Sequence, residues 1–282
     1  MQAVALDRLH CPCEIPPRFP CYAERVKLRL DRLLVERGLV PSRERGQALI
    51  LAGRILVNKQ KVDKTGAMIA GDSEIRILGK DLPYVSRGGL KLAHALQHWN
   101  VDVCGATCMD IGASTGGFTD CLLQHGAAKV IAIDTGYGQM DAKLRSDPRV
   151  RLLEKTNARY LIGQQLWPEP SLREAISLIA VDVSFISAEL ILPAVVQVAR
   201  VSGAPAFELV TLVKPQFEVG RKQVGKGGIV RDPEAQQLAV RKLCSVVEEL
   251  GGTQIEVIDS PILGGEGNKE FLLHAVFTTR IP

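Results

Sequence analysis

The sequence of 282 residues lacks the features that would place it in or beyond a membrane. No apolar run approaches the roughly 20 residues that a membrane-spanning helix needs. The N-terminus has no clean apolar region of the kind that a secretory signal contains. Its 7 cysteines are an odd number in a chain too long to need disulfide staples. We therefore expect a folded protein of the cytoplasm, with most cysteines reduced and buried.

A zinc-binding pattern is also missing from the N-terminal leader. Cys11, Cys13 and Cys21 lie in this proline-rich segment without a fourth ligand at zinc spacing. The composition of residues 1–23 is irregular and shows no sustained period. We expect a disordered leader and no metal site.

One glycine is missing from the most informative turn of the chain, where residues 110–118 read D-I-G-A-S-T-G-G-F. A short apolar strand is expected before this turn and an amphipathic helix after it. In a dinucleotide fingerprint, G-x-G-x-x-G, the middle glycine lets the backbone approach a pyrophosphate. Here Ser114 stands between Gly112 and Gly117. The turn favours a nucleoside cofactor without a pyrophosphate, such as S-adenosylmethionine; a glycine-rich turn of some other α/β protein is the alternative.

The net charge of +4 is unevenly distributed along the chain. Residues 24–80 contain 13 Lys and Arg against 7 Asp and Glu, a net charge of +6, so the remainder carries −2. A basic segment of this kind suits a polyanion, of which nucleic acid is the commonest. A merely solvated basic face would look the same by charge alone.

The basic segment has the pattern of a small α+β module. A short helix closed by Gly38 is followed by a second helix that Ser42 can cap and that stops at Gly53. Short apolar strands are expected at 55–57, near Val62 and at 74–78. We place this module at residues 24–80.

The module resembles the S4 RNA-binding domain over about 50 residues, from R-L-D-R-L-L-V-E-R-G to the turn A-G-R-I-L-V-N. The resemblance implies that five basic residues contact RNA phosphates: Arg29, Arg32, Arg43, Arg45 and Lys59. For each of them, a solvated surface charge is the alternative.

Strands and helices alternate after an expected linker at 81–90. The strands are expected at 108–111, 130–134, 178–183, 209–213, 254–258 and 271–278, and the most distinct helices at 189–200 and 233–250. Alternation of this kind predicts an α/β domain, here 91–282, with a parallel sheet covered on both faces. The last two strands are joined by a loop, so the final strand should run antiparallel.

Ionisable residues stand at the carboxyl ends of the expected strands, where ligands bind in open α/β sheets. Asp134 is placed to hold a ribose diol, and Asn157 to contact an adenine edge. Asp182 and Lys214 end the next two strands, and Glu270 begins the antiparallel one, so the three should converge.

Two carboxylates beside a lysine suit methyl transfer to a hydroxyl, which needs a base for a weakly acidic proton. Burial lowers the pKa of a lysine, whereas nearby carboxylates raise it. A second cation favours the neutral amine, and Lys91 is the candidate. Taken singly, each of these residues is better explained by structure, since strand-end lysines reach solvent and strand-end aspartates cap helices. Together they favour a catalytic site.

Residues 85–278 resemble the FtsJ-type ribose 2′-O-methyltransferases, whose Lys-Asp-Lys-Glu tetrad is matched by Lys91, Asp182, Lys214 and Glu270. The S4 module followed by V-S-R-G-G-L-K-L, V-D-V-S-F-I-S, V-K-P-Q-F-E-V-G and G-N-K-E-F is similar to the TlyA family. That resemblance implies a Rossmann-like fold that uses S-adenosylmethionine to methylate cytidine ribose in ribosomal RNA. It implies Lys214 as base, Asp182 as its partner, and Lys91 and Glu270 as supports for the ribose. The expected cofactor-binding residues are Asp110, Gly112, Ala113, Ser114, Gly116, Gly117, Phe118, Asp134, Asn157 and Asp182.

Further RNA contacts are expected from Arg87 and from a basic loop that follows the fifth strand, through Arg221, Lys222, Lys226 and Arg231. Solubility would explain the same charges. The expected partner is a ribosomal subunit or its RNA, with no membrane and no obligate protein partner.

Two other functions stay open. One is an RNA-binding protein with a vestigial methyltransferase fold, against which the intact tetrad argues. The other is a membrane-active hemolysin, a label that some relatives carry; it should show a long apolar or amphipathic segment. Pseudouridine synthases also carry S4 modules, but they have a different catalytic domain.

Overall fold

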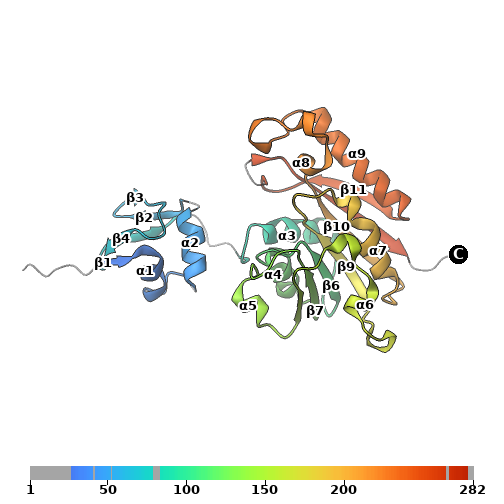
Figure 1. Ribbon diagram of the computed structural model, residues 1–282, viewed down its shortest axis with the longest axis horizontal. Helices are drawn as coiled ribbons and strands as arrows, with labels where there is room; N and C mark the ends of the chain where they lie inside the picture. Colours follow the sequence, from blue (N-terminus) through green and yellow to red (C-terminus); the bar gives the residue numbers. More distant parts are fainter. Residues whose placement is uncertain (1–26, 41, 52, 79–82, 265–266, 279–282) are drawn as a thin grey trace, which may run out of the picture. The chain divides into compact units, whose positions relative to one another are not determined.

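The chain divides into two compact units, Met1–Asp81 and Leu82–Pro282, in a computed structural model (Figure 1). The structure describes residues 27–40, 42–51, 53–78, 83–264 and 267–278. The expected disordered leader, residues 1–23, lies outside the described residues, as do Cys11, Cys13 and Cys21.

The first unit packs two short helices on small antiparallel sheets. Strand β1 (Lys27–Arg29) pairs with β4 (Met68–Ala70), and β2 (Ile55–Val57) pairs with both β3 (Gln60–Lys61) and β5 (Ile75–Ile77). The helices are α1 (Leu30–Glu36) and α2 (Arg43–Leu51). Apolar residues of the two helices and of β2 form the unit's core, which includes Leu30, Leu34, Ile50, Ile55 and Val57.

Helix α1 ends where the sequence predicts. Gly38 adopts φ 65°, a left-handed conformation that glycine reaches without a steric penalty. The pairing of β1 with β4 is not foreseen by the sequence pattern, because each strand is only three residues long.

The second unit is built on a mostly parallel sheet, with 7 strands in the described residues. Their order is β11-β12-β10-β9-β6-β7-β8. The strands are β6 (Thr107–Ile111), β7 (Lys129–Ile133), β8 (Val150–Leu153), β9 (Ile176–Val181), β10 (Ala206–Val213), β11 (Thr253–Asp259) and β12 (Phe271–Thr278). Strand β12 runs antiparallel to β10 and β11, which confirms the expectation for the last strand.

Helices cover both faces of this sheet (Figure 1). One face carries α3 (Gly88–Trp99), α4 (Gly117–Gln124) and the short α5 (Ala142–Arg145). The other carries α6 (Gly163–Leu166), α7 (Leu192–Arg200) and α9 (Pro233–Glu249). A single helical turn, α8 (Pro215–Glu218), follows β10.

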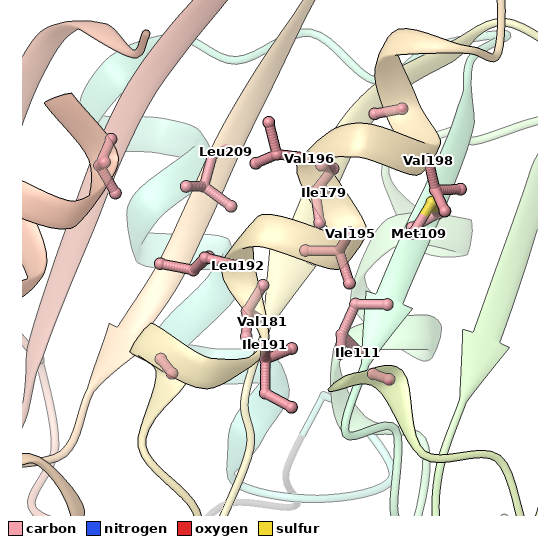
Figure 2. Close-up of a cluster of buried hydrophobic side chains, with 14 of the residues drawn as sticks. Met109, Ile111, Ile179, Val181, Ile191, Leu192, Val195, Val196, Val198 and Leu209 are labelled. Carbon is pink, nitrogen blue, oxygen red and sulfur yellow. The ribbon is translucent and has the colours of Figure 1, made fainter. Parts of the chain in front are cut away.

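The strand pleat sends alternate side chains into two separate cores. Met109 and Ile111 of β6 pack with Val195 of α7, as Figure 2 shows, whereas Cys108 of the same strand packs toward α3 and α4. Full burial of each such aliphatic side chain stabilises the fold by about 1.5–3 kcal/mol. The two cores fix β6, and therefore the loop that follows it.

Three local expectations differ from the structure. Strand β8 is not among the strands expected from the sequence. Helix α3 begins at Gly88, inside the segment expected as a linker. The helix expected at 189–200 is a 3₁₀ turn (Ala188–Leu190) followed by α7. Pro193 explains the break, because a proline has no N–H and is tolerated only in the first turn of a helix. Within the described residues, no helix is long and apolar enough to cross a membrane.

Candidate functional site

A pocket of about 260 Å³ opens at the carboxyl ends of the parallel strands in the second unit. The loop after β6, the start of α3, the end of β9 and the end of β10 supply its walls. Its lining residues are Ser86, Arg87, Gly88, Lys91, Gly112, Ala113, Ser114, Thr115, Gly117, Phe118, Asp182, Ser184 and Lys214.

The glycine turn forms one wall of the pocket. Gly112 has φ 86°, and a Cβ there would stand 2.6 Å from the carbonyl oxygen of Asp182, so a side chain would push the two strand ends apart. Ser114 is also left-handed, at φ 47°. Its N–H donates to Asp134 Oδ2 over 2.7 Å, and the N–H of Gly136 donates to Asp134 Oδ1 over 2.6 Å. Asp134 thus ties the ends of β6 and β7 together.

Asp110 lies beneath this turn rather than in the pocket lining. Its side chain is fully buried, and Thr119 Oγ1 donates to its Oδ2 over 2.6 Å. Oδ1 has no hydrogen-bond partner among the described residues. Burial raises the pKa of Asp110 to about 7, against the hydrogen bond from Thr119, and the charges of Asp182 and Asp134 raise it further.

Lys214 and Asp182 both line the pocket and contact each other there. Lys214 Nζ lies 2.5 Å from Asp182 Oδ1, in an ion pair that lacks the alignment of a hydrogen bond. Lys214 Nζ also donates a well-aligned hydrogen bond to Ser184 Oγ over 2.8 Å. One ammonium group therefore has two oxygen partners, both from the loop after β9.

Lys91 and Glu270 form a second pair, in which only the lysine lines the pocket. Lys91 Nζ donates to Glu270 Oε2 over 2.5 Å, and both side chains are buried. A Cβ at Gly264 would meet Glu270 Oε1 at 1.9 Å, so the absence of a side chain there gives Glu270 its place.

The structure brings most of the sequence-predicted site residues together. Three members of the tetrad line the pocket: Lys91, Asp182 and Lys214. The fourth, Glu270, does not line it but accepts a hydrogen bond from Lys91. The predicted cofactor residues that do not line it are Asp110, Gly116, Asp134 and Asn157. Asn157 is exposed, and its side chain caps the following turn by accepting from the N–H of Arg159.

Several pocket residues were missed by the sequence reasoning: Ser86, Gly88, Thr115 and Ser184. Ser184 stands two residues after Asp182, so its place in the strand-end loop could have marked it. Phe185 was missed as well. It is 92% exposed, has φ 65° and rests its ring against Phe217, with the centroids 5.4 Å apart.

The predicted RNA-contacting residues of the second unit are exposed. Arg87 lines the pocket. Arg221, Lys222, Lys226 and Arg231 are exposed on the connection between α8 and α9. Asn268 holds this connection, because its side chain accepts from the N–H of Val230 and donates to the carbonyl of Gly228, each over 3.0 Å.

In the first unit, two of the predicted RNA-contacting arginines already pair with a buried acid. Arg29 and Arg43 both contact Asp31 Oδ2, at 2.9 and 2.8 Å, and Gln47 donates to the same oxygen. The hydrogen bond from Arg29 holds the pKa of Asp31 well below its usual range. Arg32 and Lys59 are exposed, and the side chain of Arg45 lies outside the described residues.

Two family models match the chain. The model described as FtsJ-like methyltransferase matches residues 84–277, and the model described as S4 domain matches residues 28–75.

Similar proteins match over nearly the whole chain. This chain is 46% identical to YqxC of Bacillus subtilis over 248 residues. The match covers 88% of this chain and 85% of YqxC. This chain is 41% identical, over 88% of its length and 89% of the other's, to the 16S/23S rRNA (cytidine-2′-O)-methyltransferase TlyA of Mycobacterium tuberculosis strain H37Rv. A solved structure of a Streptococcus thermophilus protein described as a hemolysin is 40% identical, with a TM-score of 0.68 over 90% of both chains.

Proposed function

Because this chain belongs to the FtsJ-like methyltransferases and carries an S4 domain, we propose that it methylates the ribose 2′-hydroxyl of cytidines in ribosomal RNA. The relatives support the choice of substrate, since the M. tuberculosis protein is named for that reaction. The observation that carries the proposal is the convergence of two lysine–carboxylate pairs beside one glycine-lined pocket. The reaction would take place where ribosomes are, in the cytoplasm.

We propose S-adenosylmethionine as the methyl donor, and the residues present fit it. The turn from Gly112 to Gly117 lines the pocket. Cβ atoms at Gly112 and Gly117 would clash with the carbonyl oxygen of Asp182 and with Ser86, so the glycines let this turn lie close to the other pocket walls. Asp182 adds a carboxylate to the lining, and Asp134 fixes the turn from behind. When bound, this cofactor supplies an electrophilic methyl group.

The proton of the 2′-hydroxyl must be taken up as the new O–C bond forms. Lys214 is the proposed base, because its Nζ lies in the pocket and is held by Ser184 and Asp182. Asp182 orients the amine and balances the positive charge that develops on it. Lys91 donates one N–H to Glu270 and has its other two N–H donors left for the ribose oxygens.

The exposed basic residues are proposed to bind the RNA backbone. Arg87 stands at the pocket itself, and the four residues of the α8–α9 connection are exposed in the same unit. In the S4 unit, Arg32 and Lys59 are exposed for phosphate contact, whereas Arg29 and Arg43 share their charge with Asp31.

A transfer assay with mapping tests this function. The purified protein is incubated with small subunits, large subunits or naked ribosomal RNA and with methyl-labelled S-adenosylmethionine. A 2′-O-methyl group blocks alkaline cleavage of the adjacent linkage, so labelled cytidines should appear in alkali-resistant dinucleotides. Absence of label from all three RNA substrates would overturn the proposal. Label on a base, or on a nucleoside other than cytidine, would correct the reaction or its specificity.

A further inference from the structure

Glu218 is a buried carboxylate that does not line the pocket. Its Oε2 accepts from Ser187 Oγ over 2.5 Å, and its Oε1 accepts from the N–H of Ala188 over 2.8 Å. A buried carboxylate is costly to fold unless its oxygens are satisfied. Both of these partners come from the segment that follows β9, which also carries Asp182 and Ser184.

The segment 182–188 contains an unfavourable backbone conformation. Phe185 has φ 65°, a left-handed value that is rare for a bulky side chain and persists only where the surroundings determine it. The segment is held before this residue by the N–H of Asp182, which donates to Ile111 of β6 over 2.9 Å. It is held after this residue by Glu218, and at Phe185 itself by the ring of Phe217.

Glu218 and Lys214 belong to one rigid turn. Helix α8 starts at Pro215, immediately after Lys214, and ends at Glu218. Lys214 contacts the beginning of segment 182–188, and Glu218 contacts its end. The turn and the segment therefore form a closed ring of contacts, in which the position of Glu218 helps to set the distance between the lysine amine and Asp182.

We infer that Glu218 is a positioning residue for methyl transfer, which holds segment 182–188 against α8 and so keeps Asp182 and Ser184 in place beside Lys214. This inference rests on the proposed function. Lys242 of α9 lies outside this ring of contacts: its Nζ is 3.9 Å from Glu218 Oε2 and 2.5 Å from Glu189 Oε2.

Steady-state kinetics of Glu218→Ala, Glu218→Gln and Ser187→Ala test the inference. Glu218→Ala removes both acceptors, and misplacement of a reacting group by about 1 Å can cost on the order of 100-fold in rate. We expect its kcat to fall by at least about 10-fold, with the KM for ribosomal subunits and the Kd for S-adenosylmethionine within about twofold of wild type. Glu218→Gln keeps one acceptor and should restore much of kcat, and Ser187→Ala should lie between the two.

Glu189→Gln is the matched control. It removes a carboxylate from the neighbouring 3₁₀ turn that contacts Lys242 but no residue of the pocket. Its kcat should equal that of wild type. If Glu218→Ala keeps wild-type kcat, or if Glu189→Gln loses as much, the inference is wrong.

Amide hydrogen exchange separates positioning from general destabilisation. A positioning role predicts faster exchange in Glu218→Ala at 183–188 only, with the protection of β6 and β10 unchanged. Uniformly faster exchange across the second unit would show a structural role and overturn the inference. If the wild-type protein transfers no methyl group, the proposed function fails separately, and the exchange pattern still decides whether Glu218 holds the segment.

Discussion

The two lysine–carboxylate pairs beside the pocket have the same separation but different surroundings. In each pair the lysine Nζ lies 2.5 Å from a carboxylate oxygen. The Lys91–Glu270 pair is closed, since Glu270 is 2% exposed and receives an aligned hydrogen bond. The Lys214–Asp182 pair is more open: Asp182 is 21% exposed, and Lys214 has a second partner in Ser184.

This difference fits the two proposed roles: Lys91 and Glu270 hold the ribose, and Lys214 and Asp182 take part in the reaction. A closed pair keeps its ammonium group fixed, because loss of the proton would leave a buried carboxylate without compensation. An open pair with a neutral hydroxyl as second partner can pass a proton to or from a ligand. Distance alone does not mark function, since Lys129 and Glu174 are also 2.5 Å apart and do not line the pocket.

Substitution of Lys214 should have the largest effect on activity. Lys214→Arg keeps the positive charge beside Asp182, but a guanidinium cannot lose a proton in a protein, so it cannot serve as base. We expect both Lys214→Arg and Lys214→Ala to lower kcat by at least about 100-fold, the usual range for a missing general base. Single-turnover methyl transfer to ribosomal subunits measures this, and equilibrium binding of S-adenosylmethionine should remain.

Lys129→Ala is the control for these substitutions, because it breaks a pair of equal length outside the pocket. Its transfer rate should match wild type. An arginine at 214 that supports wild-type transfer would rule out Lys214 as the base, even with the function correct.

How far the sequence predicted this arrangement depends on the range of the contacts. The parallel strands other than β8, the antiparallel β12 and the convergence of Asp182, Lys214 and Glu270 follow from local periodicity and from the rule that strand ends share one rim. The short strands β1 and β4 give too little pattern to be recognised. The burial of Asp110 and the hydrogen bond from Ser187 to Glu218 depend on long-range packing, which residue spacing along the chain does not reveal.

Substitution of the carboxylate in each pair should lower the free energy of unfolding by different amounts. Glu270→Gln leaves the Lys91 ammonium buried without its counter-charge, and breaking a buried pair in this way costs about 3–5 kcal/mol. Asp182→Asn should cost less, because Asp182 is 21% exposed and Ser184 still accepts from Lys214. Urea unfolding at pH 7 measures both. Equal losses of unfolding free energy in the two variants would contradict the distinction between an open and a closed pair.

Asp110 gives the most specific test, because the charge of Asp182, from only one of the two pairs, contributes to its raised pKa. An acid whose pKa is raised on folding binds more protons in the folded state. Its contribution to stability therefore falls as the pH rises from the unfolded pKa near 4 to the folded pKa of about 7, by at most about 1.4 kcal/mol per pH unit. Asp110→Asn should remove this slope from the free energy of unfolding measured between pH 4 and 8. The charge of Asp182 contributes to the raised pKa of Asp110. In Asp182→Asn the free energy of unfolding should therefore stop falling at a lower pH than in wild type. In Glu270→Gln that pH should be unchanged. A slope that moves equally in both variants, or that survives Asp110→Asn, would show that the pH dependence does not come from the buried acid beside the open pair.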